Sequence, residues 1–198
     1  IQVDSSAENA ILLFGGANQS ITQDEIERGL KRSSEGDWLL LQNEINGIDE
    51  IMRFAADKGL KVFFNPAPMT SEIRSLPLDI VNWLIVNELE GEMITGQQSA
   101  EKILETAIAR FPDISILLTL GSKGVHFADK AQRLFIPAEQ VTPVDTTGAG
   151  DTFIGYFIAE ISTGSSVKKA MLTANRAAAF CVTRPGAATS IPYRNELA

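Results

Sequence analysis

Short apolar runs alternate with segments of helical periodicity along most of this chain. Between the runs, apolar residues recur every three or four positions, and this spacing predicts amphipathic helices. The apolar runs predict strands at 10–14, 37–42, 60–64, 81–86 and 114–120, and the periodic segments predict helices at about 22–32, 48–58 and 100–110. Strands that alternate with helices in this way indicate a mostly parallel sheet covered by helices.

The last third of the chain departs from this alternation. Residues 125–128 and 133–136 are short apolar runs with a few residues between them, which predicts an antiparallel pair of strands. After them, the patterns over 148–161 and 166–183 predict the last two helices. We therefore expect the sheet to end in an antiparallel pair and the chain to end in a pair of helices.

Residues 1–198 are expected to form a single α/β domain. No linker, low-complexity tract or internal repeat interrupts the pattern, and a domain typically takes about 150 residues. The chain opens with Ile1 in place of Met, and strand-like residues follow at once. We therefore expect this domain to be incomplete at its N-terminus and part of a longer polypeptide.

Composition narrows the classes of partner. Lys and Arg number 17 against 25 Asp and Glu, a net charge of −8, and this field repels nucleic acid and acidic lipid surfaces. Cys181 and His126 are the single cysteine and the single histidine, so an internal disulfide and a zinc site of Cys and His are excluded. No apolar run approaches the ~20 residues of a membrane span. We expect a soluble, cytoplasmic protein with no nucleic-acid or membrane partner.

The most informative segment is the glycine-rich run at 144–153. Gly148 and Gly150 allow a tight turn whose amide N–H groups precede an apolar helical stripe, and such a loop binds anions. On these residues alone, an ordinary turn with Asp151 in the first helical turn is equally consistent. The run is neither a P-loop nor a dinucleotide fingerprint, because no Gly-Lys pair follows and position 153 is Phe.

The residues DTTGAGDTF at 145–153 closely resemble the C-terminal signature of the ribokinase or PfkB family of carbohydrate kinases. Further matches stand in the family's order and span most of the chain, at 42–44 (QNE), 65–68 (NPAP), 87–90 (NELE), 119–124 (TLGSKG) and 182–192 (VTRPGAATSIP). The resemblance implies a ribokinase-like three-layer α/β/α fold with a mostly parallel central sheet.

One part of the family's pattern has no counterpart here. The N-terminal strands, the lid sheet, the Gly-Gly-x-x-Asn sugar motif and its clamping aspartate are lacking. Residues 15–18 (GGAN) look superficially like that motif, but they follow a predicted strand and precede a capped helix, so we interpret them as structural or lid-adjacent. We expect the chain 1–198 alone to bind MgATP weakly, to phosphorylate ribose negligibly and to self-associate through an exposed sheet edge.

By the same resemblance, the glycine-rich run carries catalysis. Asp151 is the expected base, which contacts the sugar hydroxyl and accepts its proton, a role worth about 10² to 10⁴ in rate. The N–H groups of Gly148, Ala149 and Gly150 are expected to stabilise the transferring phosphoryl group.

Two further groups are assigned to the nucleotide. By spacing alone, Asn87 and Glu90 form a helix cap and its capping-box partner, but the resemblance favours Asn87 as a nucleotide contact and Glu90 as a water-mediated ligand of the Mg²⁺ that accompanies ATP. The positions that resemble the family's remaining nucleotide contacts are Thr119, Gly121, Gly124 and Asn175. For Asn175, a polar residue on a helix face is an equal alternative.

The sugar and a monovalent cation complete the predicted site. Glu44 follows a strand, where open α/β sheets bind ligands, and is the best sugar-binding candidate, against the alternative of a solvated loop acid. Asp145 is either a strand-end turn residue or, by resemblance, a K⁺ ligand. Its expected companions are the carbonyls of Thr147, Cys181, Arg184 and Gly186 and the hydroxyl of Ser190.

The resemblance implies ATP-dependent phosphorylation of a primary sugar hydroxyl, with D-ribose and its O5 as the leading acceptor. Another sugar or nucleoside kinase of the same family is the first alternative. A truncated nucleotide-binding domain without catalysis is the second. For the full-length protein we expect ATP, Mg²⁺ and K⁺ as cofactors and a homodimer as the assembly.

Overall fold

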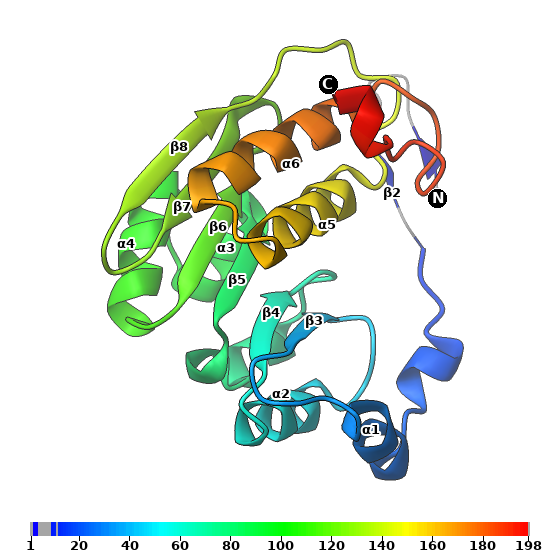
Figure 1. Ribbon diagram of the computed structural model, residues 1–198, viewed down its shortest axis with the longest axis vertical. Coiled ribbons are helices and arrows are strands. Elements are labelled where there is room, and N and C mark those ends of the chain that lie inside the picture. The colour runs from blue at the N-terminus through cyan, green and yellow to red at the C-terminus, as the bar shows by residue number, and fades with distance from the viewer. Residues whose placement is uncertain (1, 4–8, 11, 198) are drawn as a thin grey trace. The chain divides into compact units, whose positions relative to one another are not determined.

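The structure is a computed structural model that describes residues 2–3, 9–10 and 12–197 (Figure 1). Contacts divide the chain into two compact units. We call residues 14–119 with 126–133 the sheet unit, and the described residues among 1–13, 120–125 and 134–198 the helix-pair unit. Whether the chain folds as one domain stays a prediction.

The sheet unit is built on parallel strands. Residue pairs such as Leu39 with Val62 and Leu84 with Ile116 are in register across neighbouring strands. The strands, in the order in which they lie across a six-stranded sheet, are β3 (Trp38–Gln42), β4 (Lys61–Asn65), β5 (Trp83–Asn87), β6 (Ser115–Thr119), β7 (Gly124–Ala128) and β8 (Arg133–Pro137). Residues 124–125 of β7 and 134–137 of β8 are counted with the helix-pair unit. The predicted strands from 37 onward are thus found within two residues of their expected ends.

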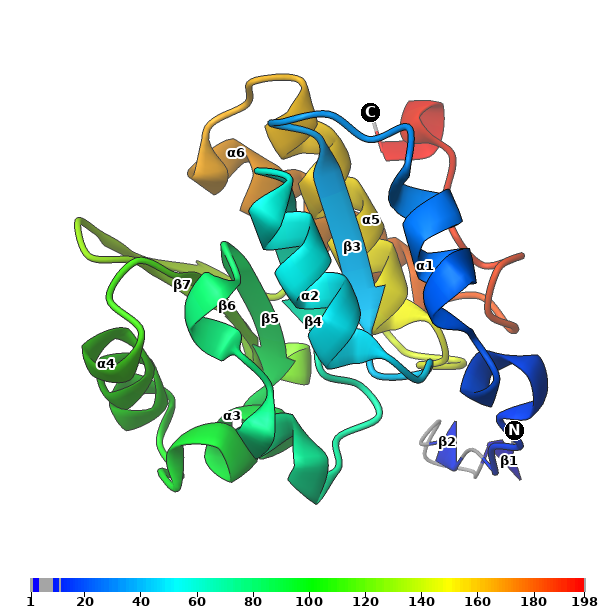
Figure 2. The same ribbon diagram turned by 90° about the horizontal axis from the view of Figure 1, so that it is seen from below.

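Three helices of the sheet unit pack against its strands. The helix after β3 packs against β4, and the two helices after β5 pack against β5 and β6, as Figure 2 shows for the first of them. These helices are α2 (Ile48–Asp57), α3 (Glu88–Thr95) and α4 (Ala100–Arg110), and α1 (Gln23–Leu30) precedes β3. Short 3₁₀ helices of the same unit are η1 (Gly16–Gln19), η2 (Ser71–Ser75) and η3 (Leu78–Ile80), and η4 (Gly121–Lys123) belongs to the helix-pair unit.

Both faces of the sheet are buried at β4, where Phe63 and Phe64 are 1% and 0% exposed. On one face, aromatic rings continue from strand to strand: Trp38 stacks on Phe63 at 4.9 Å and Phe63 on Trp83 at 5.6 Å between ring centroids. Trp83 pairs in register with the small Ser115 of β6. Because that side chain is small, Trp83 reaches Phe127 of β7 at 5.7 Å. This aromatic row links four neighbouring positions across the sheet on one face.

The helix-pair unit is built on α5 (Ala149–Ser162) and α6 (Val167–Cys181), which lie side by side (Figure 1). The α6 residues Ala170, Ala174 and Ala177 are 0% exposed and recur at helical spacing, so their small side chains let the two helices approach closely. The unit also holds β1 (Gln2–Val3) and β2 (Asn9–Ala10), which pair antiparallel, and η5 (Arg194–Leu197).

The strand predicted at 10–14 is wrong over the residues that the structure describes. Strand β2 ends at Ala10, residue 11 lies outside the described residues, and Leu12 and Phe14 are 97% and 96% exposed. An apolar run becomes a strand only beside a hydrogen-bonded neighbour, and residues 12–14 belong to neither sheet. In the described part of the chain, no helix is long and apolar enough to cross a bilayer.

Gly124 is required by the backbone of β8. Its φ of +123° lies in a region that side chains rarely adopt, and a Cβ atom there would lie 2.1 Å from the carbonyl oxygen of Ile136. The N–H of Leu120 donates to the Gly124 carbonyl at 2.8 Å. Packing alone therefore explains glycine at this predicted nucleotide position.

We expect Gly124→Ala to lower the free energy of unfolding by about 3 kcal/mol or more, because backbone strain and overlap act together. The control is Gly155→Ala in α5, where a Cβ meets nothing within 4 Å and helix propensity predicts a gain of about 0.5 to 1 kcal/mol. Urea unfolding measures both. Equal stability of the two variants would contradict this account of Gly124.

Candidate active site

Parallel strands bring their carboxyl ends to one edge of the sheet unit, and predicted site residues lie there. Asn87 ends β5 and Thr119 ends β6, and the two are partners in register. The hydroxyl of Thr119 donates to the carbonyl of Val86 at 3.4 Å. The structure therefore brings these two predicted nucleotide residues side by side at the edge where open α/β sheets bind ligands.

Glu44 lies in a loop at the same edge, just after β3, and its side chain is exposed. The loop is held from two directions. Asn46 exchanges two hydrogen bonds with the backbone of Ile21, at 2.9 and 2.8 Å, and Gln19 donates to the Glu44 carbonyl at 3.1 Å. On the other side, the amide of Asn43 donates to the Pro68 carbonyl at 2.7 Å. The backbone of Glu44 is thus fixed while its carboxylate faces solvent.

Residues 15–18 take part in holding that loop. The N–H of Asn46 donates to the carbonyl of Asn18 at 3.0 Å, and η1 covers residues 16–19. The structural interpretation of the GGAN run agrees with these contacts. Its role toward any ligand stays untested.

The sequence match at 65–68 assigned Asn65 no role, and the structure places this residue at the end of β4, on the same edge. Asn65 is 7% exposed, accepts from the Gln42 amide at 3.0 Å and donates to the Ile85 carbonyl at 2.9 Å. One side chain therefore links the ends of β3, β4 and β5. The available signal was a polar residue that ends an apolar run.

Asn87 and Glu90 form a capping box at the start of α3. The Asn87 side chain accepts from the N–H of Glu90 at 2.9 Å, and the Glu90 carboxylate accepts from the N–H of Asn87 at 2.8 Å. Glu90 is 5% exposed, and its burial raises the pKa of the carboxyl, which the Asn87 N–H only partly offsets. The helix-cap alternative is therefore present, and the Mg²⁺ role remains a prediction for the same carboxylate.

Because the pKa of Glu90 is raised, the folded chain binds this proton more tightly than the unfolded chain does. Its contribution to stability is present below the ordinary value of 4.5 and is lost as pH rises through the raised value. Glu90→Gln keeps the capping acceptor and removes the buried charge. We expect this variant to be at least as stable as the parent at neutral pH, with a difference that shrinks toward pH 4.5.

Urea unfolding at several pH values, without Mg²⁺, measures that difference. The control is Glu105→Gln, the same replacement at an exposed position on α4. If Glu90→Gln destabilises the chain, and does so most strongly at neutral pH, the charged carboxylate stabilises the fold and this account is wrong.

The nucleotide positions of the helix-pair unit have structural partners. Gly121 begins η4 with φ of +54°. The side chain of Asn175 donates to the carbonyl of Pro137 at 2.7 Å, so it ties α6 to the end of β8. The alternative of a polar helix-face residue thus has a concrete contact, and the role of Asn175 as a nucleotide contact stays a prediction.

The glycine-rich run forms the start of α5. Gly148 is the N-cap residue with φ of +78°, α5 begins at Ala149, and Asp151 lies exposed in the first turn. The N–H of Ala149 donates to the Thr146 carbonyl at 3.3 Å. A helix start of this kind presents backbone N–H groups and the positive end of the helix dipole to an anion.

The Asp145 carboxylate connects this run to the C-terminal segment. One oxygen accepts from the N–H of Thr147 at 2.9 Å and the other from the N–H of Gly186 at 2.8 Å. The Thr147 hydrogen bonds, with that from Gly186, hold the pKa of Asp145 below its usual range. The carboxylate therefore stays charged at neutral pH between the two segments.

Buried polar atoms gather beside this carboxylate. Cys181 and Ser190 are both 0% exposed, with 3.0 Å between Sγ and Oγ, and Ser190 donates to the Ala187 carbonyl at 2.6 Å. The Cys181 thiol lies 3.9 Å from the Thr147 carbonyl, and the Arg184 N–H donates to the Cys181 carbonyl at 3.1 Å. A carboxylate, a hydroxyl and several carbonyls are hard oxygen donors, and this chemistry fits K⁺.

The predicted site residues are divided between the two units. The sheet unit contains Glu44, Asn87, Glu90 and Thr119, and the helix-pair unit contains Gly121, Gly124, Asp145, Thr147, Gly148, Ala149, Gly150, Asp151, Asn175, Cys181, Arg184, Gly186 and Ser190.

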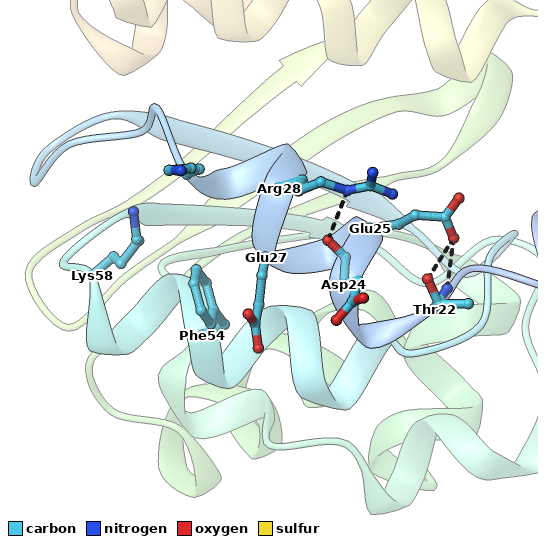
Figure 3. Close-up of a pocket in the computed structure, with 8 residues that line it drawn as sticks. Thr22, Asp24, Glu25, Glu27, Arg28, Phe54 and Lys58 are labelled. Atoms are coloured by element: carbon cyan, nitrogen blue, oxygen red, sulfur yellow. Dashed lines mark hydrogen bonds between the residues drawn. The ribbon is translucent and has the colours of Figure 1, made fainter.

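A surface hollow of about 680 Å³ lies between α1 and α2 (Figure 3). Predicted site residues do not line it. Its polar groups largely bond to one another or to the backbone: Lys58 donates to the Leu30 carbonyl at 2.9 Å, and Arg28 donates to the Asp24 carbonyl at 3.2 Å. We assign it no ligand.

A sequence model described as pfkB family carbohydrate kinase matches residues 1–194. The chain belongs to this family. Ribokinase of Haemophilus influenzae is 37% identical over 99% of this chain and 66% of that protein. The crystal structure of Thermotoga maritima ribokinase matches with a TM-score of 0.81 and 34% identity, over 98% of this chain and 66% of that one. Arabidopsis thaliana ribokinase, complexed with ribose and ATP, matches with a TM-score of 0.77 and 29% identity, over 98% and 65%.

Two predictions are confirmed by these matches. The family resemblance is correct, and the α/β fold with a mostly parallel central sheet is that of the PfkB kinases. The chain spans about two thirds of the length of these relatives. The roles of the individual site residues stay predictions.

Proposed function

We propose that the complete protein transfers the γ-phosphoryl group of ATP to a primary sugar hydroxyl, with O5 of D-ribose as the acceptor. The observation that carries the proposal is the Gly148–Asp151 turn at the start of α5, in a chain of the PfkB family. The names of the ribokinase relatives support ribose in particular.

In the proposed reaction, the Asp151 carboxylate accepts the proton of the sugar hydroxyl. The electron pair left on the sugar oxygen forms the new bond to the γ-phosphorus, while the bond from this phosphorus to the bridging oxygen of ADP breaks. The N–H groups of Gly148, Ala149 and Gly150 hold the equatorial oxygens of the transferring group. Glu44 orients the sugar by accepting from its hydroxyls.

The proposed nucleotide contacts follow from the family to which the chain belongs. Asn87, Thr119 and Asn175 contact ATP, and Gly121 and Gly124 shape the backbone beside it. Glu90 would hold Mg²⁺ through water, and this ion would supply positive charge beside the phosphates of ATP. Carboxylate and amide oxygens are suited to that ion, although both side chains also cap α3.

For the monovalent cation, we propose the oxygen cluster around Asp145. The Asp145 carboxylate and Ser190 hydroxyl supply side-chain oxygens, and the carbonyls of Thr147, Cys181, Arg184 and Gly186 complete the set. A cation held by these oxygens would order the turn at Gly148 without touching substrate. We also retain our prediction of a cytoplasmic homodimer for the complete protein.

Asp151→Asn in the complete protein should lower the rate of phosphorylation by at least ~10², because a general base contributes about 10² to 10⁴. MgATP affinity should stay within a few-fold of the parent's, because the carboxylate that is replaced repels phosphate and does not hold it. A coupled ADP assay and calorimetry measure the two quantities. Asp79→Asn, an exposed position in η3, is the control, and near-normal turnover of the Asp151→Asn variant would exclude Asp151 as the base.

K⁺ should activate the complete protein more than Na⁺ or Li⁺ does at the same ionic strength. Asp145→Ala should abolish this preference, because it removes a ligand and the acceptor of two backbone N–H groups. Turnover measured against each chloride salt, at saturating Mg²⁺, gives the test. Indifference to K⁺ with normal Mg²⁺ dependence would refute the cation assignment and leave the kinase proposal standing.

A further inference from the structure

The segment from Val182 to Leu197 contains the predicted cation ligands Arg184, Gly186 and Ser190, yet it has no regular structure before η5. A segment without its own hydrogen-bonding pattern takes its shape from contacts with its surroundings. The contacts that fix this segment are therefore candidates for controlling the cation site.

One contact comes from Tyr156 on α5. Its hydroxyl donates to the carbonyl of Pro192 at 2.6 Å, and the residue is partly buried. Pro192 follows Ser190 by two positions, so this hydrogen bond fixes the backbone immediately after the buried hydroxyl.

A second contact comes from Glu160, one turn further along α5. Glu160 is 1% exposed, accepts from the Ser165 hydroxyl at 2.6 Å and pairs with the guanidinium of Arg194. The ammonium of Lys169 lies 3.7 Å away. A buried carboxylate needs such partners, and Arg194, which is 65% exposed, is thereby held against α5.

The other end of the segment is fixed at Arg184. Its guanidinium lies over the Phe180 ring at 4.3 Å and donates to the Glu196 carboxylate at 2.5 Å. The second oxygen of Glu196 accepts from the N–H of Tyr193 at 2.7 Å. The contact between Arg184 and Glu196 thus closes the segment into a loop. Tyr156 and Glu160 attach this loop to α5 at Pro192 and Arg194.

We propose that Tyr156 and Glu160 are positioning residues for the monovalent cation: by holding Pro192 and Arg194, they keep Ser190 beside Cys181 before the cation binds. This inference rests on the proposed cation site. Without these attachments the loop samples more conformations, and the cation must order it on binding. That cost lowers the apparent affinity and leaves the cation-bound state unchanged.

The test uses Tyr156→Phe in the complete protein, because it removes one hydroxyl and preserves the ring. Melting temperature is followed against KCl at constant ionic strength with choline chloride as the replacement salt. The K⁺ concentration for half-maximal activation is measured separately. We expect both midpoints to rise about threefold to tenfold, as for loss of one hydrogen bond, with kcat at saturating K⁺ retained.

Tyr193→Phe is the matched control, since Tyr193 lies in the same segment and is 79% exposed. It should leave both midpoints unchanged. Arg194→Ala tests the Glu160 attachment without removing the buried acid and should also raise both midpoints, and Arg194→Lys should restore them in part because it keeps a cation beside Glu160.

The outcomes distinguish failure of this inference from failure of the proposed cation site. If K⁺ affects the parent and Tyr156→Phe and Arg194→Ala lower only the melting temperature, with unchanged K⁺ midpoints, the residues are merely structural and the inference is wrong. If K⁺ neither stabilises nor activates the parent, the cation site itself fails and the inference falls with it.

Discussion

The carboxylate of Asp145 is the constraint on which the helix-pair unit depends. Its two oxygens accept N–H groups from Thr147 and Gly186, and the second contact joins residues 41 positions apart. Gly186 has φ of +93° and Gly148, just after Thr147, has φ of +78°, so both turns need glycine where they meet this carboxylate. The start of α5 and the C-terminal segment therefore take their shapes together, and the proposed phosphoryl and cation sites share one support.

The sheet unit meets a comparable constraint with amide side chains. At the carboxyl ends of its parallel strands the ladder of backbone hydrogen bonds stops, and buried polar groups there need other partners. Asn65 supplies them between Gln42 and Ile85, and the reciprocal cap of Asn87 and Glu90 begins α3. This edge consequently presents polar groups from a rigid support, which suits a ligand site.

Much of the fold follows from local patterns in the sequence. The apolar runs form strands and the periodic segments form helices, both close to their expected bounds. The prediction works because the apolar residues that define each pattern are the ones buried where helices pack on a parallel sheet. The strand expected at 10–14 fails because pairing depends on a neighbour that no local pattern contains. Gly124 and Asn175 show a different limit: their partners, Ile136 and Pro137, are distant in sequence, so a structural role could not be separated from a ligand role. The role of Tyr156 could not be predicted either, because its partner Pro192 is also distant in sequence.

The central claim is that the complete protein couples ATP consumption to phosphorylation of ribose. Phosphorus NMR of a reaction containing the complete protein, ATP, Mg²⁺, K⁺ and ribose follows both products at once, with 2-deoxyribose, fructose and adenosine as competing acceptors. The account predicts ADP and ribose 5-phosphate in equal amounts, with ribose preferred over the other acceptors. ADP that appears without any phosphorylated acceptor, or ATP that is bound but never consumed, would contradict it.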